Sequence, residues 1–175
     1  MPPERVKLVI TDVDGVLTDG TIGLDARGAE VKFFSIQDGL GIRLLQLGGI
    51  EVAFLSSRPS DVVRARAEEL GVKARFSDIR AKRSALESLL DEVRAASPDE
   101  PLEADDVCYI GDDIVDIPCL RRVGFPVAVA NARPEVQEAA EYVTRAEGGR
   151  GAFREVADLV LRARGRWDSV LEAFR

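Results

Sequence analysis

Histidine is absent from this chain of 175 residues, and cysteine occurs only twice. Without histidine there can be no Ser–His triad, no histidine general base and no histidine-ligated zinc. Cys108 and Cys119 match neither a disulfide framework nor a metal-binding spacing, and we expect both thiols to be buried packing residues. These absences exclude the histidine-dependent classes of enzyme.

Long apolar runs and an excess of positive charge are also lacking. No apolar run approaches the roughly 20 residues needed to span a bilayer, and residues 1–5 lack the apolar segment of a signal peptide. We therefore expect a cytoplasmic protein with no membrane partner. The formal net charge of −7 argues against a nucleic-acid partner, and it means that an anionic substrate needs locally placed cations.

Apolar strands alternate with helical patterns along almost the whole chain. We expect Asp38 and Ser60 to cap two of the helices, and residues 97–106 to form a solvated loop. The repeated β-α units predict an α/β fold with a doubly wound, mainly parallel, Rossmann-like sheet. The length favours one domain over residues 1–175. Strands are expected at residues 6–13, 51–55, 73–76, 107–110, 126–130 and 142–144, and further helices around residues 86–93, 117–123, 134 onwards and 153–163.

A β-hairpin flap is predicted over residues 20–36, directly after the first strand, with its turn at residues 25–28. Neither the stretch before Ser56 nor the stretch from Ser56 to Lys82 has room for a separate cap domain. The tail, residues 165–175, carries Trp167, Val170, Leu171 and Phe174 as an apolar stripe at helical spacing. This stripe docks either on its own domain or on a neighbouring subunit.

Two aspartates, Asp12 and Asp14, come directly after the first apolar strand. α/β proteins bind ligands at the carboxyl ends of such strands. Two carboxylates there, with no Lys or Arg within four residues, are costly unless a cation lies between them, and Mg²⁺ is the natural candidate. An ordinary Asp-x-Asp-Gly turn is the alternative interpretation.

Three other strand or helix ends add polar residues: Ser56-Ser57-Arg58, Lys82, and Asp112-Asp113 with Asp116. Together they suit phosphoryl transfer. Asp12 can attack phosphorus, and Asp14 can protonate the leaving alkoxide and then deprotonate water. Mg²⁺ held by Asp12 and Asp112 would neutralise charge, while Ser56 and Lys82 hold phosphate oxygens.

The alternatives are plainer. Ser56 could be a turn or cap residue, and Lys82 an ordinary exposed lysine on a helix. Asp113 and Asp116 are expected to orient ligands or to cap the following helix rather than to contact the metal.

These residues resemble the motifs of a known superfamily. Residues 12–20, Ser56-Ser57-Arg58, Lys82 and residues 111–116 resemble, in order, the four motifs of the haloacid-dehalogenase-like phosphatases. Residues 34–43 and 148–152 resemble, more narrowly, segments of the 3-deoxy-D-manno-octulosonate 8-phosphate phosphatase family. The similarity runs from about residue 6 to residue 163. Two positions depart from the family pattern, since Ser56 stands where relatives usually have Thr and Ser57 where they usually have Gly.

The resemblance implies an Mg²⁺-dependent phosphomonoesterase that releases the free sugar acid and phosphate through an aspartyl-phosphate. By it, Asp12 is the nucleophile, Asp14 the acid/base and a metal ligand through its backbone carbonyl, and Asp112 the third ligand. It further implies a homotetramer in which hairpins associate and a neighbour's C-terminal segment helps to cover the site. The substrate contacts that it implies are Ser35, Ile36, Gln37, Asp38, Gly39, Arg43, Arg58, Arg66 and Lys82.

Two other functions stay open at this point. The same chemistry could act on a related sugar acid, such as a nine-carbon keto-deoxy acid 9-phosphate. The chain could also be a non-catalytic binding relative, although every expected catalytic position is filled. Each arginine could instead be part of a solvated helix face.

Overall fold

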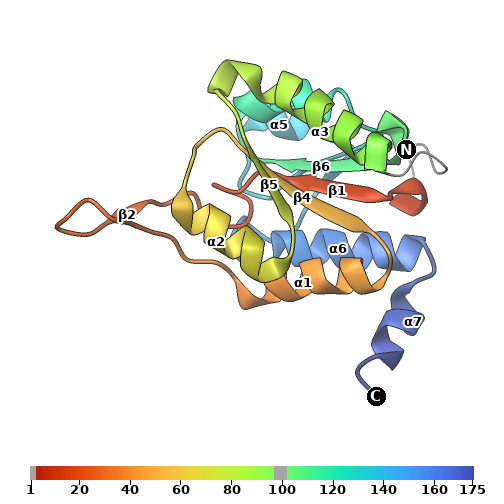
Figure 1. Ribbon diagram of the computed structural model, residues 1–175. Helices are drawn as coiled ribbons and strands as arrows, with labels where there is room; N and C mark the ends of the chain where they lie inside the picture. The colour runs from red at the N-terminus through yellow and green to blue at the C-terminus, as the bar shows by residue number, and fades with distance from the viewer. Residues whose placement is uncertain (1–2, 97–101) are drawn as a thin grey trace.

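A parallel sheet of six strands forms the centre of the molecule, with the strand order β5-β4-β1-β6-β7-β8 (Figure 1). The computed structural model describes residues 3–96 and 102–175. Every neighbouring pair of these strands is parallel. The predicted doubly wound α/β fold is confirmed. The strands are β1 (Leu8–Thr11), β4 (Glu51–Ser56), β5 (Lys73–Phe76), β6 (Val107–Gly111), β7 (Phe125–Ala128) and β8 (Tyr142–Val143).

Helices cover both faces of the sheet. In Figure 1, α1 and α6 lie below it, side by side, and α3 and α5 lie above it. The bounds are α1 (Ile36–Leu47), α2 (Asp61–Leu70), α3 (Lys82–Ala96), α4 (Ile117–Leu120), α5 (Pro134–Glu138), α6 (Ala152–Ala163) and α7 (Trp167–Glu172). Short 3₁₀ helices occupy Pro3–Arg5, Ile79–Ala81, Ala104–Asp106 and Ile114–Asp116. No helix in the described ranges is long and apolar enough to cross a membrane.

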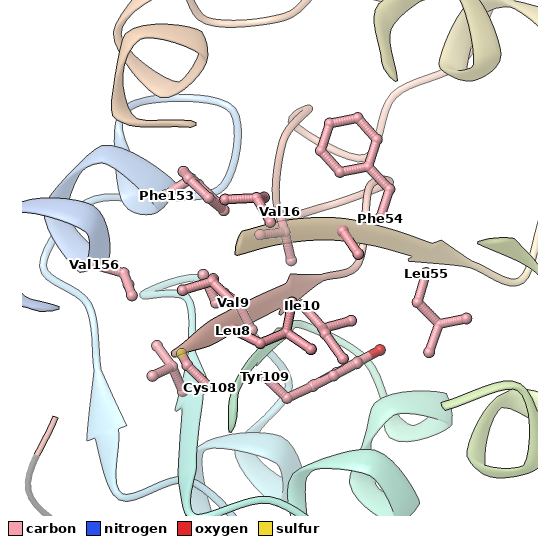
Figure 2. Close-up of a cluster of buried hydrophobic side chains, with 14 of the residues drawn as sticks. Leu8, Val9, Ile10, Val16, Phe54, Leu55, Cys108, Tyr109, Phe153 and Val156 are labelled. Atoms are coloured by element: carbon pink, nitrogen blue, oxygen red, sulfur yellow. The ribbon is translucent and has the colours of Figure 1, made fainter. Parts of the chain in front are cut away.

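The core is built on β1, whose four residues are all buried because the strand lies in the middle of the sheet and is covered on both faces. Figure 2 shows Val9 and Ile10 of this strand among side chains from β4, β6 and α6. Cys108 is one of them, and both cysteines are free and buried, as predicted. Burial, with nearby Asp116, raises the pKa of the Cys119 thiol to about 12.

The predicted N-terminal cap is found at α2 but not at α1. Ser60 caps α2 as predicted. The prediction that Asp38 caps α1 is wrong, because Ser35 is the N-cap and its Oγ accepts the N–H of Asp38. The buried Asp38 carboxylate instead accepts the N–H groups of Gly151 and Arg154, at 3.2 and 2.9 Å, and so caps the distant helix α6. Burial raises the pKa of Asp38, against the effect of these N–H groups.

The predicted hairpin is present, with β2 (Gly23–Leu24) antiparallel to β3 (Glu30–Val31), although its ladder is shorter than expected. Asp25 closes the turn, because its Oδ1 accepts the N–H groups of Arg27 and Ala29, each at 2.8 Å. In Figure 1 the hairpin projects far from the body of the molecule. No cap domain is found in the described part of the chain, as predicted: only the hairpin and α1 lie between β1 and β4, and α2, β5 and a 3₁₀ turn lie between β4 and α3.

The tail forms helix α7, which docks partly on its own domain. Val170 is buried, and the Arg162 guanidinium lies 4.1 Å from the centre of the Trp167 ring. Phe174 stays 60% exposed. Figure 1 places α7 and the C-terminus at the end of the molecule opposite to the hairpin. Of the predicted loop at 97–106, residues 97–101 lie outside the described ranges, and the last three form a 3₁₀ turn.

Candidate active site

The carboxyl ends of three adjacent strands meet at the point where the strand order reverses. β1 lies between β4 and β6, and α/β sheets bind ligands in the crevice at such a switch point. Asp12 follows β1, Ser56 ends β4, and Asp112 follows β6. The strand order therefore brings together polar residues that lie about 40 to 100 positions apart in the sequence.

Lys82 lies between two buried aspartates at this point. It is the first residue of α3, it is only 1% exposed, and its Nζ is 2.9 Å from Asp12 Oδ2 and 2.7 Å from Asp116 Oδ1. Lys82 is thus not a surface residue. Asp116 also accepts the Tyr109 hydroxyl at 2.6 Å and the N–H groups of Asp112 and Asp113, at 3.0 and 3.3 Å. Both Asp116 oxygens are therefore occupied, and the residue orients Lys82 and the loop after β6.

Glycine allows the Asp112 carboxylate to approach the loop after β1. Gly15 has a φ of +96°, which L side chains rarely adopt. A Cβ at this position would lie 2.1 Å from Asp112 Oδ2. Gly15 is therefore required both by its backbone conformation and by the space that the carboxylate occupies.

Negative charge in this cluster exceeds the positive charge that faces it. Carboxylate oxygens of Asp12, Asp112 and Asp116 lie within 4.8 Å of one another. Burial, followed by the Asp116 carboxylate, raises the pKa of Asp12 to about 7, although Lys82 acts in the opposite direction. Burial and the neighbouring Asp12 raise the pKa of Asp112 to about 8. Asp112 Oδ1 is buried with no hydrogen-bond partner in the described chain. Such a site fits a divalent cation that prefers oxygen ligands, such as Mg²⁺.

The hairpin adds two residues that the sequence reasoning missed. Lys32 forms an ion pair with Asp14 Oδ1, and its side chain has no solvent exposure. Its Nζ is also 3.5 Å from Glu30 Oε1. Only the spacing of Glu30 and Lys32 in the sequence could have indicated this ion pair, because residues two apart on an extended segment share a face.

The Ser56 hydroxyl holds the loop after β4 in place through two hydrogen bonds to the backbone. Ser56 is buried, and its Oγ accepts the Arg58 N–H at 3.1 Å and donates to the Arg58 carbonyl at 3.2 Å. Ser57 Oγ is buried without a partner in the described ranges, and its backbone φ is not positive, so its Cβ introduces no strain. The Arg58 guanidinium lies 3.1 Å from Glu30 Oε1.

Two other expected substrate contacts, Arg43 and Arg66, lie where α1 meets α2. Arg43 donates to the Glu69 carbonyl at 2.6 Å, and Arg66 forms an ion pair with the Glu69 carboxylate at 2.8 Å. Arg66 also covers the Phe34 ring and Gly39. Of the remaining positions, Ser35 and Asp38 act in helix capping, as described above, and Ile36 and Gln37 are exposed.

Comparison with known proteins agrees with this geometry. Residues 81–152 match the haloacid dehalogenase-like hydrolase family. The 3-deoxy-D-manno-octulosonate 8-phosphate phosphatase KdsC of Haemophilus influenzae is 42% identical over 163 residues, which cover 93% of this chain and 87% of that protein. The enzyme of the same name from Escherichia coli K12 is also 42% identical, over 94% of this chain and 84% of its own length. The chain belongs to this phosphatase family.

Solved structures of the family extend the agreement to three dimensions. The phosphatase of Moraxella catarrhalis, in complex with magnesium, phosphate and a KDO molecule, has a TM-score of 0.90 and 35% identity, covering 99% of this chain and 95% of that one. The cobalt-bound phosphatase of Haemophilus influenzae has a TM-score of 0.83 and 40% identity, over 93% and 91% of the two chains. Both structures carry a divalent metal, which agrees with the acidic cluster found here.

Proposed function

We propose that this protein hydrolyses 3-deoxy-D-manno-octulosonate 8-phosphate to the free sugar acid and phosphate, using Mg²⁺ and an aspartyl-phosphate intermediate. The observation that carries this proposal is Asp12, a buried carboxylate at the switch point, paired with a buried lysine and flanked by the unpartnered Asp112. Membership of a phosphatase family whose named substrate is this sugar phosphate supports the choice of substrate.

In the first half-reaction an Asp12 carboxylate oxygen bonds to phosphorus, and the bond from phosphorus to the sugar oxygen breaks. Asp14 gives its proton to the departing alkoxide. In the second half-reaction, Asp14 takes a proton from water while the water oxygen bonds to phosphorus. The bond from phosphorus to Asp12 then breaks, which releases phosphate and restores both carboxyl groups. Ser56 and Lys82 hold phosphate oxygens throughout.

Asp12, Asp112 and the backbone carbonyl of Asp14 would hold the magnesium ion. Their fit rests on the buried Asp112 oxygen without a partner and on the crowded carboxylates around it. When bound, the ion supplies positive charge that offsets the repulsion between the carboxylates and the phosphate. Lys82 supplies further positive charge to the same cluster, since it contacts Asp12 and Asp116.

The first test measures phosphate release from a panel of eight-carbon and nine-carbon sugar acid phosphates and simple sugar phosphates, with Mg²⁺ and with a chelator. We expect turnover that requires the metal and a preference for the eight-carbon acid of at least about tenfold in kcat/KM, since one specific contact is worth about that much. Preference for the nine-carbon acid, or a flat and slow profile, would overturn the substrate. Absence of release from every ester would overturn the phosphatase activity itself.

We further propose that residues 1–175 form one capless catalytic domain that works in the cytoplasm as a homotetramer. Val31 and Phe33 of the hairpin are exposed at 43% and 84%, which supports association through this element. An open site has poor exclusion of water, and a neighbour's tail would improve it. In its own chain α7 lies away from the hairpin, and the Phe174 ring that follows it stays exposed, which supports a contact of the tail with another subunit.

Deletion of residues 165–175 should therefore lower kcat/KM severalfold, as measured by phosphate release, while light scattering still reports an assembly. The Phe174→Ser variant tests the same contact without removing the tail, since this ring is exposed in the single chain and contributes little to its own fold. The variant should leave the unfolding temperature unchanged but share part of the loss in activity. A monomer that stays fully active without the tail would disprove both the assembly and the covering role.

A further inference from the structure

The hairpin places a charged residue in the active site of its own chain. Lys32 comes directly after β3, and its fully buried ammonium group pairs with Asp14 and with Glu30. Val31 and Phe33 alternate with these charged positions and are exposed. Residues 30–33 therefore have one charged face turned inward and one apolar face turned outward. A buried ammonium group is costly without counter-charges, so its two partners define where it stays.

Glu30 fixes the hairpin against the loop after β4. Its Oε1 lies 3.1 Å from the Arg58 guanidinium, and its Oε2 accepts a hydrogen bond from the Ser60 hydroxyl. Ser60 is itself held in place, because its Oγ accepts the Val63 N–H as the N-cap of α2. Contacts within its own chain, through Glu30 and the N-terminal end of α2, thus set the position of Lys32.

Asp14 is held at one oxygen only. Its Oδ1 is paired with Lys32, whereas its Oδ2 is buried with no hydrogen-bond partner in the described chain. The ion pair fixes the orientation of the carboxyl group and leaves Oδ2 as the oxygen that would carry the proton. This is the arrangement that the two half-reactions proposed above require of Asp14.

We propose that Lys32, held by Glu30, is a positioning residue that orients the Asp14 carboxyl group for both proton transfers. The proposal rests on the proposed phosphatase function. It assigns the hairpin a role in catalysis within its own subunit, in addition to its proposed role in association. Lys32 does not itself exchange a proton or touch phosphorus in this scheme.

The Lys32→Met variant tests the proposal with two kinds of ester. A sugar phosphate releases an alkoxide that needs a proton from Asp14, so kcat should fall about 10²-fold, the usual contribution of a general acid, with little change in KM. An aryl phosphate with an acidic phenol needs no such proton. Its first turnover should stay close to the wild-type rate and appear as a burst of phenol. Slow steady-state turnover should follow, because hydrolysis of the phosphoenzyme still requires Asp14.

Arg27→Met is the matched control, since it removes a positive charge from the exposed hairpin turn, away from Asp14; it should retain wild-type rates on both esters. Light scattering should give the same assembly for both variants. If Lys32→Met fails to fold, the Lys32→Met/Glu30→Gln double variant replaces it, because it removes one of the two carboxylates left without a cation. This double variant should show the same difference between the two esters.

Equal loss on both esters in the first turnover would overturn the proposal in favour of phosphate binding or a purely structural role. Wild-type rates on both would overturn it as well. Failure of the proposed function would be visible separately, in the wild-type protein. A wild type that cleaves only simple alkyl and aryl phosphates loses the proposed substrate but keeps this test, and an inactive wild type overturns both proposals.

Discussion

Asp12→Asn is expected to abolish turnover while the protein stays folded. The amide cannot attack phosphorus, so kcat should fall by about 10⁴-fold or more, as for other enzymes that lose their nucleophile. The fold should survive because the Asn oxygen can still accept the Val13 N–H, which Asp12 Oδ1 accepts at 2.7 Å, and because Lys82 keeps Asp116 as its partner. Phosphate release, acid-quench trapping of phosphoenzyme and thermal unfolding measure the three consequences.

Two further variants make this result specific. Asp113→Asn makes the same change of charge beside the site, at an exposed carboxylate that caps the 3₁₀ turn Ile114–Asp116, and should keep wild-type turnover. Asp12→Ala excludes hydrolysis of the new amide back to aspartate as a source of residual activity. Turnover of Asp12→Asn within tenfold of wild type, or phosphoenzyme trapped from it, would mean that another group is the nucleophile.

The sheet and its carboxylate cluster could be predicted because their determinants are local. A strand covered on both faces reads as an apolar run, so the residue after each run marks a strand end. Asp12 and Asp112 were predicted to act together for this reason, and the structure brings them within metal-binding distance. Asp116, which was expected to orient ligands or to cap the following helix, accepts the N–H groups of Asp112 and Asp113 after β6. Its ion pair with Lys82 depends on how α3 packs, which no local pattern reveals.

The side-chain contacts of Asp38 and Lys32 with distant segments could not be predicted. Asp38 reads as a helix cap for the residues that follow it, but its carboxylate reaches the N-terminus of a helix more than 100 positions away. Lys32 was missed because its direction depends on the register of a two-residue ladder in the hairpin. A shift of one residue would turn it to the opposite face. In both cases the sequence identifies the element correctly, and the tertiary contact decides what the side chain does.

Lys82→Met is expected to impair both the fold and the chemistry, since it removes the cation between Asp12 and Asp116. Burial opposes the charge, but the two carboxylates raise the pKa of Lys82 above its usual value, so the group is charged at neutral pH. Breaking such a buried pair from one side costs about 3–5 kcal/mol of unfolding free energy. Turnover should fall by at least about 10³-fold, because the phosphate loses a preorganised partner.

The Lys82→Met/Asp116→Asn double variant separates the two effects. The double variant removes one of the two carboxylates that Lys82→Met leaves without a cation. The new amide can still bond to the Tyr109 hydroxyl and to the N–H groups after β6. Denaturant unfolding should therefore recover a large part of the lost stability, and phosphate release should not recover. If turnover returned together with stability, Lys82 would be a structural counter-ion for the aspartates. Persistent loss of turnover in a stable protein would assign it to the transferring phosphate, because the fold no longer depends on its charge.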